Sequence, residues 1–182
     1  LGVGFGRVRV TATDTQKVAN TSATAASSGT DLNGKAAQDA ARQIRDEIGA
    51  EAIGMSADVG VKEQVEAMVQ RVVDEFGGLD ILVNNAATLA PNILLEDKTD
   101  AMLQRTMDIA LWGSWWGMRA ALPHFKARGG GSVINFYSID AQVGAWLHAD
   151  YNIAKAAILG LTRSAAVEWG RFNIRVNAIA PT

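Results

Sequence analysis

Three side chains in the second half of the sequence have the types and spacing needed for proton transfer. Tyr151 and Lys155 are four residues apart, and Ser138 precedes the tyrosine by thirteen residues. Side chains four apart on a helix lie on one face, so both can reach the same pocket. The positive charge of a lysine favours the phenolate and lowers the tyrosine pKa from about 10. Such a phenol can exchange a proton with an alcohol or carbonyl oxygen that the serine holds, which is typical of an oxidoreductase site.

The composition argues against several other kinds of site and partner. The 182 residues suffice for about one domain, and the net charge of −2 provides no basic excess for binding nucleic acid. The absence of cysteine removes disulfides, thiol catalysis and zinc–thiolate sites, and it agrees with a reducing cytoplasm. His124 and His148 have no metal-ligand spacing with carboxylates, so we predict no metal site. No apolar run approaches the roughly 20 residues that cross a bilayer, so we expect no membrane partner.

Apolar periodicity from residue 34 onward alternates between helix and strand. The strand 79–83 is apolar throughout, as expected for a strand buried on both faces. Strands separated by helices predict parallel pairing with right-handed crossovers. We therefore expect an α/β fold, a Rossmann-like doubly wound parallel sheet with helices on both faces. The predicted helices are 34–48, 61–76, 99–126 (bent) and 151–169, and the predicted strands are 52–57, 79–83, 132–137 and 174–180.

Several polar residues stand where predicted strands end. They are Asp58, Asn84-Asn85, Ser138 and Pro181. Because ligands of such sheets bind at the carboxyl ends of the strands, we expect these residues on one rim, with the start of the helix that carries Tyr151. Taken singly, the aspartate could equally be a turn or capping residue, and the asparagine pair a strand-ending turn.

The first thirty residues do not follow the alternation. Residues 8–29 are rich in Thr, Ala and Ser and have no helical apolar stripe. Two explanations remain open: a poorly ordered segment, or a damaged or frame-shifted stretch of coding sequence, which we favour. The nucleotide sequence of this region distinguishes them.

The order and spacing of these motifs resemble those of the short-chain dehydrogenase/reductase family over residues 31–182. The segment 79–87 is similar to the Asn-Asn-Ala-Gly strand of the family, with Ala87 in place of the glycine. The segment 175–181 resembles the one that follows the active-site helix. The further matching positions are Asp58-Val59 after the third strand, and Ser138, Tyr151 and Lys155 at the family spacing.

The resemblance implies a nicotinamide-dependent enzyme that acts on a small-molecule alcohol or carbonyl substrate. Tyr151 would be the general acid/base, Lys155 would lower its pKa and bind the nicotinamide ribose, and Ser138 would orient the substrate oxygen. Asp31 matches the acidic residue that binds the adenosine ribose. A carboxylate there would repel a 2′-phosphate, so NAD is favoured over NADP. The other cofactor-binding positions that the resemblance implies are Leu32, Asp58, Val59, Asn84, Ala86 and Pro181.

The sequence also departs from the family pattern in three places. The first strand and the start of the glycine-rich turn are missing, with only Gly4 and Gly6 as partial matches. Ala110 stands where the family has an asparagine that helps to hold the lysine and a proton-relay water, so weaker proton transfer is expected. The chain also ends where the family continues into a substrate lid and a last strand. We therefore expect a single dinucleotide-binding domain over residues 1–182, incomplete at both termini.

Two alternative functions remain open. One is a non-catalytic dinucleotide-binding or dimerisation module, and the other is a dehydratase or epimerase of the same family. The tryptophans favour packing or subunit contact, which agrees with a homodimer or homotetramer, because the helices that carry them form the dimer contact of the family. Trp146 could equally border the substrate pocket. The tryptophans on these helices are Trp112, Trp115, Trp116 and Trp169.

Overall fold

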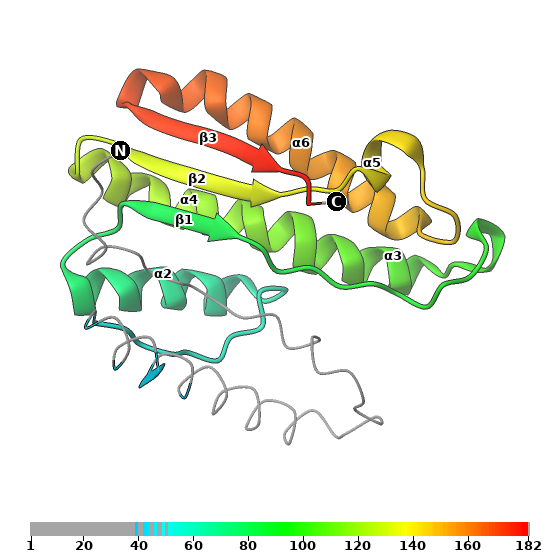
Figure 1. The fold of residues 1–182 in the computed structure, drawn as a ribbon, viewed down its shortest axis with the longest axis horizontal. Helices are drawn as coiled ribbons and strands as arrows, with labels where there is room; N and C mark the ends of the chain where they lie inside the picture. Colours follow the sequence, from blue (N-terminus) through cyan, green and yellow to red (C-terminus); the bar gives the residue numbers. More distant parts are fainter. Residues whose placement is uncertain (1–38, 40–41, 44–45, 47–48, 50, 182) are drawn as a thin grey trace. The chain divides into compact units, whose positions relative to one another are not determined.

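The computed structural model describes residues 39, 42–43, 46, 49 and 51–181 (Figure 1). They belong to two units with bounds 1–57 and 58–182. In the first unit, the described positions between 39 and 46 are helical, as predicted for 34–48. Gly49 has a φ of 65°, the left-handed conformation that commonly follows a helix. The predictions for residues 1–30, Asp31 and Leu32 lie outside the described residues. The single-domain organisation stays a prediction.

The strand predicted at 52–57 is wrong, because residues 51–58 have no regular secondary structure. A strand persists when its backbone groups pair with a neighbour. Within the described residues the sheet has the order β1-β2-β3, and the segment 52–57 is not among its strands. Apolar composition alone is therefore insufficient to make this segment a strand.

Three parallel strands form the sheet of the second unit. They are β1 (Ile81–Asn84), β2 (Gly131–Phe136) and β3 (Ile174–Ile179), side by side in that order (Figure 1). The register places Asn84 opposite Asn135, and Asn135 opposite Ala178. Each strand overlaps its predicted range, and no strand begins or ends more than two residues from its predicted first or last residue. All three strands run in one direction, so their carboxyl ends share an edge.

The helices follow the predicted order. The second helix of the chain buries the predicted stripe Val65, Met68, Val69 and Val72, and it ends at Gly77, which has a φ of 71°. The short elements η2, α5 and η4 were not predicted. The helical elements are α2 (Lys62–Phe76), η2 (Leu95–Asp97), α3 (Asp100–Met107), η3 (Asp108–Trp112), α4 (Gly113–Ala127), α5 (Asp140–Val143), α6 (Ala149–Trp169) and η4 (Gly170–Phe172).

The long bent helix predicted at 99–126 contains a π-helical turn. Thr99 caps α3, because its Oγ1 accepts a hydrogen bond of 3.3 Å from the N–H of Met102. The π-helical turn η3 then joins α3 to α4 and buries Ile109 and Ala110. A π-turn inserts an extra residue into a helix and often lies near a functional site. The predicted bend therefore coincides with this turn.

Helices α4 and α6 pack on the same face of the sheet. The Nδ2 of Asn135 on β2 contacts Met118 of α4 and Thr162 of α6, so both helices lie on the side to which this residue points. Phe125 of α4 lies so close to Gly131 that a Cβ on the glycine would overlap the ring. Helix α2 packs against α4. Among residues 58–181 no helix packs on the opposite face, so the predicted second layer stays a prediction.

The tryptophans of these helices differ in burial. Trp112 and Trp115 are 39% and 38% exposed, and Trp112 stacks on Trp116 with 6.1 Å between the ring centroids. Trp169 is 9% exposed and packs within its own chain. Trp146, in the segment between α5 and α6, is 77% exposed. Among the described helices, none is both long and apolar enough to span a membrane.

Candidate active site

The three predicted catalytic side chains meet at the carboxyl end of β2. Ser138 follows this strand, and Tyr151 and Lys155 lie in the first two turns of α6. The side chain of Ser138 lies close enough to the Tyr151 hydroxyl to stabilise its phenolate form. The Nζ of Lys155 lies 5.5 Å from the centroid of the tyrosine ring. Since Ser138 is 8% and Lys155 3% exposed, a buried hydroxyl and a buried ammonium group lie beside the half-buried phenol.

Local backbone contacts fix these side chains. The N–H of Asp140 donates a hydrogen bond of 3.1 Å to Ser138 Oγ, and the N–H of Ala141 donates one of 3.1 Å to the serine carbonyl. Lys155 Nζ donates a hydrogen bond of 2.7 Å to the carbonyl of Phe136 and so ties α6 to the last residue of β2. The strand end, the short helix α5 and the start of α6 therefore form one connected support.

Burial raises the pKa of Tyr151 above its ordinary value. The interaction with Ser138 acts in the opposite direction, and the negative charge of Asp140 adds to the increase. The sequence led us to expect that Lys155 lowers this pKa. The net direction in the structure is the opposite, because burial of the phenol outweighs the interaction with Ser138 that favours the phenolate, and the effect of Lys155 itself stays a prediction. The phenol is therefore protonated at neutral pH.

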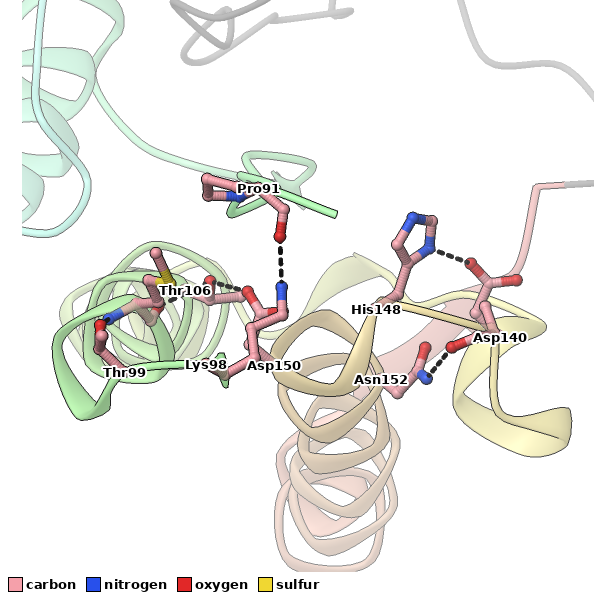
Figure 2. Close-up of polar contacts among 10 residues, drawn as sticks. Pro91, Lys98, Thr99, Thr106, Asp140, His148, Asp150 and Asn152 are labelled. Atoms are coloured by element: carbon pink, nitrogen blue, oxygen red, sulfur yellow. Dashed lines mark hydrogen bonds and ion pairs between the residues drawn. The ribbon is translucent and has the colours of Figure 1, made fainter. Parts of the chain in front are cut away.

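Further polar side chains, which the sequence did not single out, surround Tyr151. The ring of His148 meets the tyrosine edge-on, with 6.3 Å between centroids. Its Nδ1 lies 3.7 Å from a carboxylate oxygen of Asp140 (Figure 2). Asn152 donates a hydrogen bond of 3.0 Å to the carbonyl of Ala145, while its Oδ1 is buried without a hydrogen-bond partner. His148 lies in the loop before α6, as expected for an ordinary surface or loop histidine, and it is half-buried beside the phenol.

Asp58 shapes the turn that leads into α2. Its Oδ1 accepts a hydrogen bond of 2.9 Å from the N–H of Gly60, and its carboxylate pairs with Arg105 at 3.2 Å. The carbonyl of Val59 would lie 2.8 Å from a Cβ at Gly113, so this turn packs closely against the start of α4. Asp58 thus has the turn function that the sequence left as an alternative. Its side chain is 41% exposed, which leaves the carboxylate accessible to a ligand.

The side chain of Asn84 belongs to a buried network. Its Nδ2 donates a hydrogen bond of 2.8 Å to Asn135 Oδ1, and Asn135 Nδ2 donates one of 2.9 Å to Thr162 Oγ1. The threonine in turn donates one of 2.8 Å to the carbonyl of Ile158. The bond to Asn135 uses one N–H of the Asn84 carboxamide. Sequence reasoning missed Asn135, although an asparagine inside an apolar strand was an available signal.

The remaining predicted positions lie at the same edge of the sheet or outside the described residues. Ala86 follows β1 and Pro181 follows β3, where the carboxyl ends of the strands meet (Figure 1). Ala110, at the position of the family asparagine, is 2% exposed, and its carbonyl accepts a hydrogen bond of 2.7 Å from Ser114 Oγ. Leu32 and Asp31 lie outside the described residues.

The family of this chain follows from its match to a known family model. A family model described as "Enoyl-(Acyl carrier protein) reductase" matches residues 15–182. The chain belongs to the short-chain dehydrogenase/reductase family. The resemblance recognised in the catalytic motif is therefore confirmed.

Curated relatives of this short-chain dehydrogenase/reductase are dehydrogenases and reductases. It is 40% identical over 145 residues to cis-4-hydroxycyclohexanecarboxylate dehydrogenase of Sinomonas cyclohexanicum, an alignment that spans 80% of this chain and 58% of that protein. It is 35% identical over 150 residues to a sorbose reductase of Schizosaccharomyces pombe, spanning 81% and 58% of the two chains. The chain thus spans less than two thirds of the length of these relatives.

Solved structures of the same family share the fold. L-Sorbose reductase from Gluconobacter frateurii, complexed with NADPH and L-sorbose, matches with a TM-score of 0.78 and 35% identity over 81% of this chain and 56% of that one. NAD⁺-bound xylitol dehydrogenase matches with a TM-score of 0.78 and 31% identity, over 82% and 57%. The predicted α/β fold of a short-chain dehydrogenase/reductase is therefore confirmed, and proteins that bind either nicotinamide cofactor are among the similar structures.

Proposed function

We propose that this protein is a nicotinamide-dependent oxidoreductase that transfers hydride between the cofactor and a small alcohol or carbonyl substrate. The observation that carries the proposal is the convergence of Tyr151, Ser138 and Lys155 at the carboxyl end of a parallel strand. Membership of a family whose compared members are dehydrogenases and reductases supports it.

In this mechanism Tyr151 is the general acid/base. A substrate carbonyl oxygen accepts hydrogen bonds from Ser138 and Tyr151, and it receives the phenolic proton as hydride reaches the carbonyl carbon. In the reverse direction the phenolate removes the proton of an alcohol.

The residues present suit a nicotinamide cofactor. The ammonium group of Lys155 can donate to ribose hydroxyls, and the accessible carboxylate of Asp58 can accept from an adenine amino group. When bound, the cofactor supplies or accepts the hydride. We propose NAD rather than NADP, because Asp31 would repel a 2′-phosphate. The other proposed contacts with the cofactor are Leu32, Val59, Asn84, Ala86, Tyr151 and Pro181.

The test is oxidation of NADH and NADPH by the purified protein with a panel of cyclic ketones and ketoses. The chain contains two tyrosines, so Tyr137→Phe is a matched control for Tyr151→Phe. We expect Tyr151→Phe to lower kcat by about 100-fold or more while NADH binding is retained, and Tyr137→Phe to turn over normally. Unchanged turnover in Tyr151→Phe would refute the mechanism. NADH binding without turnover of any substrate would indicate a non-catalytic module, and water loss or epimerisation without net NADH consumption would indicate a dehydratase or epimerase.

We also propose a homodimer or homotetramer that uses the exposed tryptophans, and a cytoplasmic location. Trp115 is 38% exposed with the guanidinium of Arg119 5.7 Å from its ring, and Trp112 is exposed beside it. Replacing Trp115 with glutamate places a charge at the centre of this surface. Sedimentation velocity should then show a smaller assembly than the wild type, and an unchanged assembly would exclude this surface as the interface.

A further inference from the structure

A buried ion pair lies directly before Tyr151, at the second residue of α6. Asp150 is 2% exposed, and its Oδ1 lies 2.6 Å from the Nζ of Lys98, whose side chain is 5% exposed. Its Oδ2 accepts a hydrogen bond of 2.7 Å from Thr106 Oγ1. Lys98 Nζ also donates one of 2.8 Å to the carbonyl of Pro91 (Figure 2). One carboxylate therefore joins α6 to α3 and to the segment between β1 and α3.

The main partners of this carboxylate lie outside its own helix. An acidic residue in a first turn usually interacts with the free N–H groups of that turn. Both oxygens of Asp150 are instead directed across to Lys98 and Thr106, and the N-cap residue His148 makes no side-chain capping bond. Burial raises the pKa of Asp150, but the lysine and the threonine outweigh it and the net pKa lies below the ordinary value. The group is therefore an ionised carboxylate at neutral pH, held by fixed partners.

The position of Tyr151 depends on how this turn is held. The N–H groups in the first turn of a helix lack partners within the helix, so the turn is fixed by contacts with its surroundings. Tyr151 follows Asp150 by one residue, which corresponds to about 100° of rotation around the helix. Asp150 thus fixes the side of the turn that faces α3, while the phenol meets Ser138 on another side.

We propose that Asp150, held by Lys98 and Thr106, is a positioning residue that sets the rotation of the first turn of α6 and thereby the place of the Tyr151 hydroxyl against Ser138. Its effect on turnover rests on the proposed function. A displacement of about 1 Å at a reacting group can cost on the order of 100-fold in rate. Release of this contact should therefore lower kcat and leave KM for the cofactor nearly unchanged.

Two nearly isosteric variants test the proposal by kinetics. Asp150→Asn removes the charge, and Thr106→Val removes the hydroxyl that donates to Asp150 and to the carbonyl of Met102 and changes no charge. We expect kcat to fall by roughly 10- to 100-fold in the first and several-fold in the second, with KM for NADH within about threefold. Asp100→Asn is the matched control, because Asp100 is an exposed acid in the first turn of α3. Its kcat should equal that of the wild type.

A spectroscopic measurement tests the same proposal without turnover. With ¹³C-labelled tyrosine the protein gives signals from Tyr137 and Tyr151, and Tyr137→Phe assigns them. The charged or titratable neighbours of Tyr151, namely Asp140, His148 and Lys155, are retained in every variant. Thr106→Val should shift the Tyr151 signal and its titration while the Tyr137 signal stays in place, and such a shift reports geometry because no charge has changed.

The outcomes separate the two proposals. Folded Asp150→Asn and Thr106→Val with wild-type kcat and a wild-type Tyr151 signal would overturn the positioning role. A fall in kcat that only follows the folded fraction, measured by circular dichroism, would overturn it as well. A wild-type protein that reduces no carbonyl would refute the proposed function instead, and the Tyr151 signal would then decide the positioning role by itself.

Discussion

Replacement of Asn135 by leucine should destabilise the protein strongly although it keeps nearly the same volume. Asn135 is 0% exposed and bridges two elements through hydrogen bonds of 2.8 Å from Asn84 and 2.9 Å to Thr162. Leucine can make neither bond. The Nδ2 of Asn84 then loses its acceptor, while Thr162 keeps its bond to Ile158.

The expected cost follows from these partners. A buried group left without its hydrogen bond costs about 1–3 kcal/mol, and here the main one is the Asn84 carboxamide, with a smaller contribution from Thr162. We therefore expect a loss of about 2–4 kcal/mol in the free energy of unfolding. For a chain of this size that loss corresponds to a fall in Tm of about 10 °C.

Urea unfolding followed by circular dichroism measures this difference. The matched control is Asn177→Leu, because Asn177 is an exposed asparagine on β3. The control should change stability by less than about 0.5 kcal/mol, as surface substitutions usually do. An Asn135→Leu variant as stable as this control would show that the network contributes nothing net, and the reasoning would be refuted.

Three further predictions concern the helix, the sheet and the ion pair. Ala110→Asn restores the family residue in the π-turn and should raise kcat several-fold; an equal or lower kcat at saturating substrate would count against the role given to this position. Gly131→Ala brings a methyl group into the ring of Phe125 and should cost about 1–3 kcal/mol in urea unfolding, whereas unchanged stability would contradict the close contact. Asp150 has a lowered pKa in the folded state, so its stabilising contribution is present above the unfolded value of about 3.9 and is lost as the pH falls below it. Wild-type Tm should therefore decrease more steeply than that of Asp150→Asn below about pH 4, and parallel curves would contradict this assignment.

The three strands and the long helices of residues 58–181 could be predicted from local patterns because those patterns report local burial. The stripe from Val65 to Val72 and the left-handed Gly77 define α2 without reference to any other element. The segment 52–57 has a similar apolar pattern but forms no strand, because strand formation also requires a partner elsewhere in the chain. Local composition carries no information about that partner.

Sequence reasoning could predict only those site residues that are recognised by their spacing along the chain. Tyr151 and Lys155 are one helical turn apart, and the structure brings them to Ser138 as expected. The contact between Lys98 and Asp150 joins residues that are far apart in sequence, so it depends on how α3 packs on α6. The raised pKa of Tyr151 was not predicted for a related reason, because burial is a property of the assembled site.

The π-turn η3 (Asp108–Trp112) sets how this protein can tolerate changes in length. Its additional residue lies between α3, which carries Thr106, and α4, which packs on the sheet. Deletion of one residue here would restore a regular helix, but it would rotate α3 by about 100° relative to α4 and turn Thr106 away from Asp150. We therefore expect the continuous helical stretch of α3, η3 and α4 to accept many substitutions but few insertions or deletions. The number of residues in η3 determines how α3, which contacts the catalytic helix α6, is oriented relative to α4, which packs on the sheet.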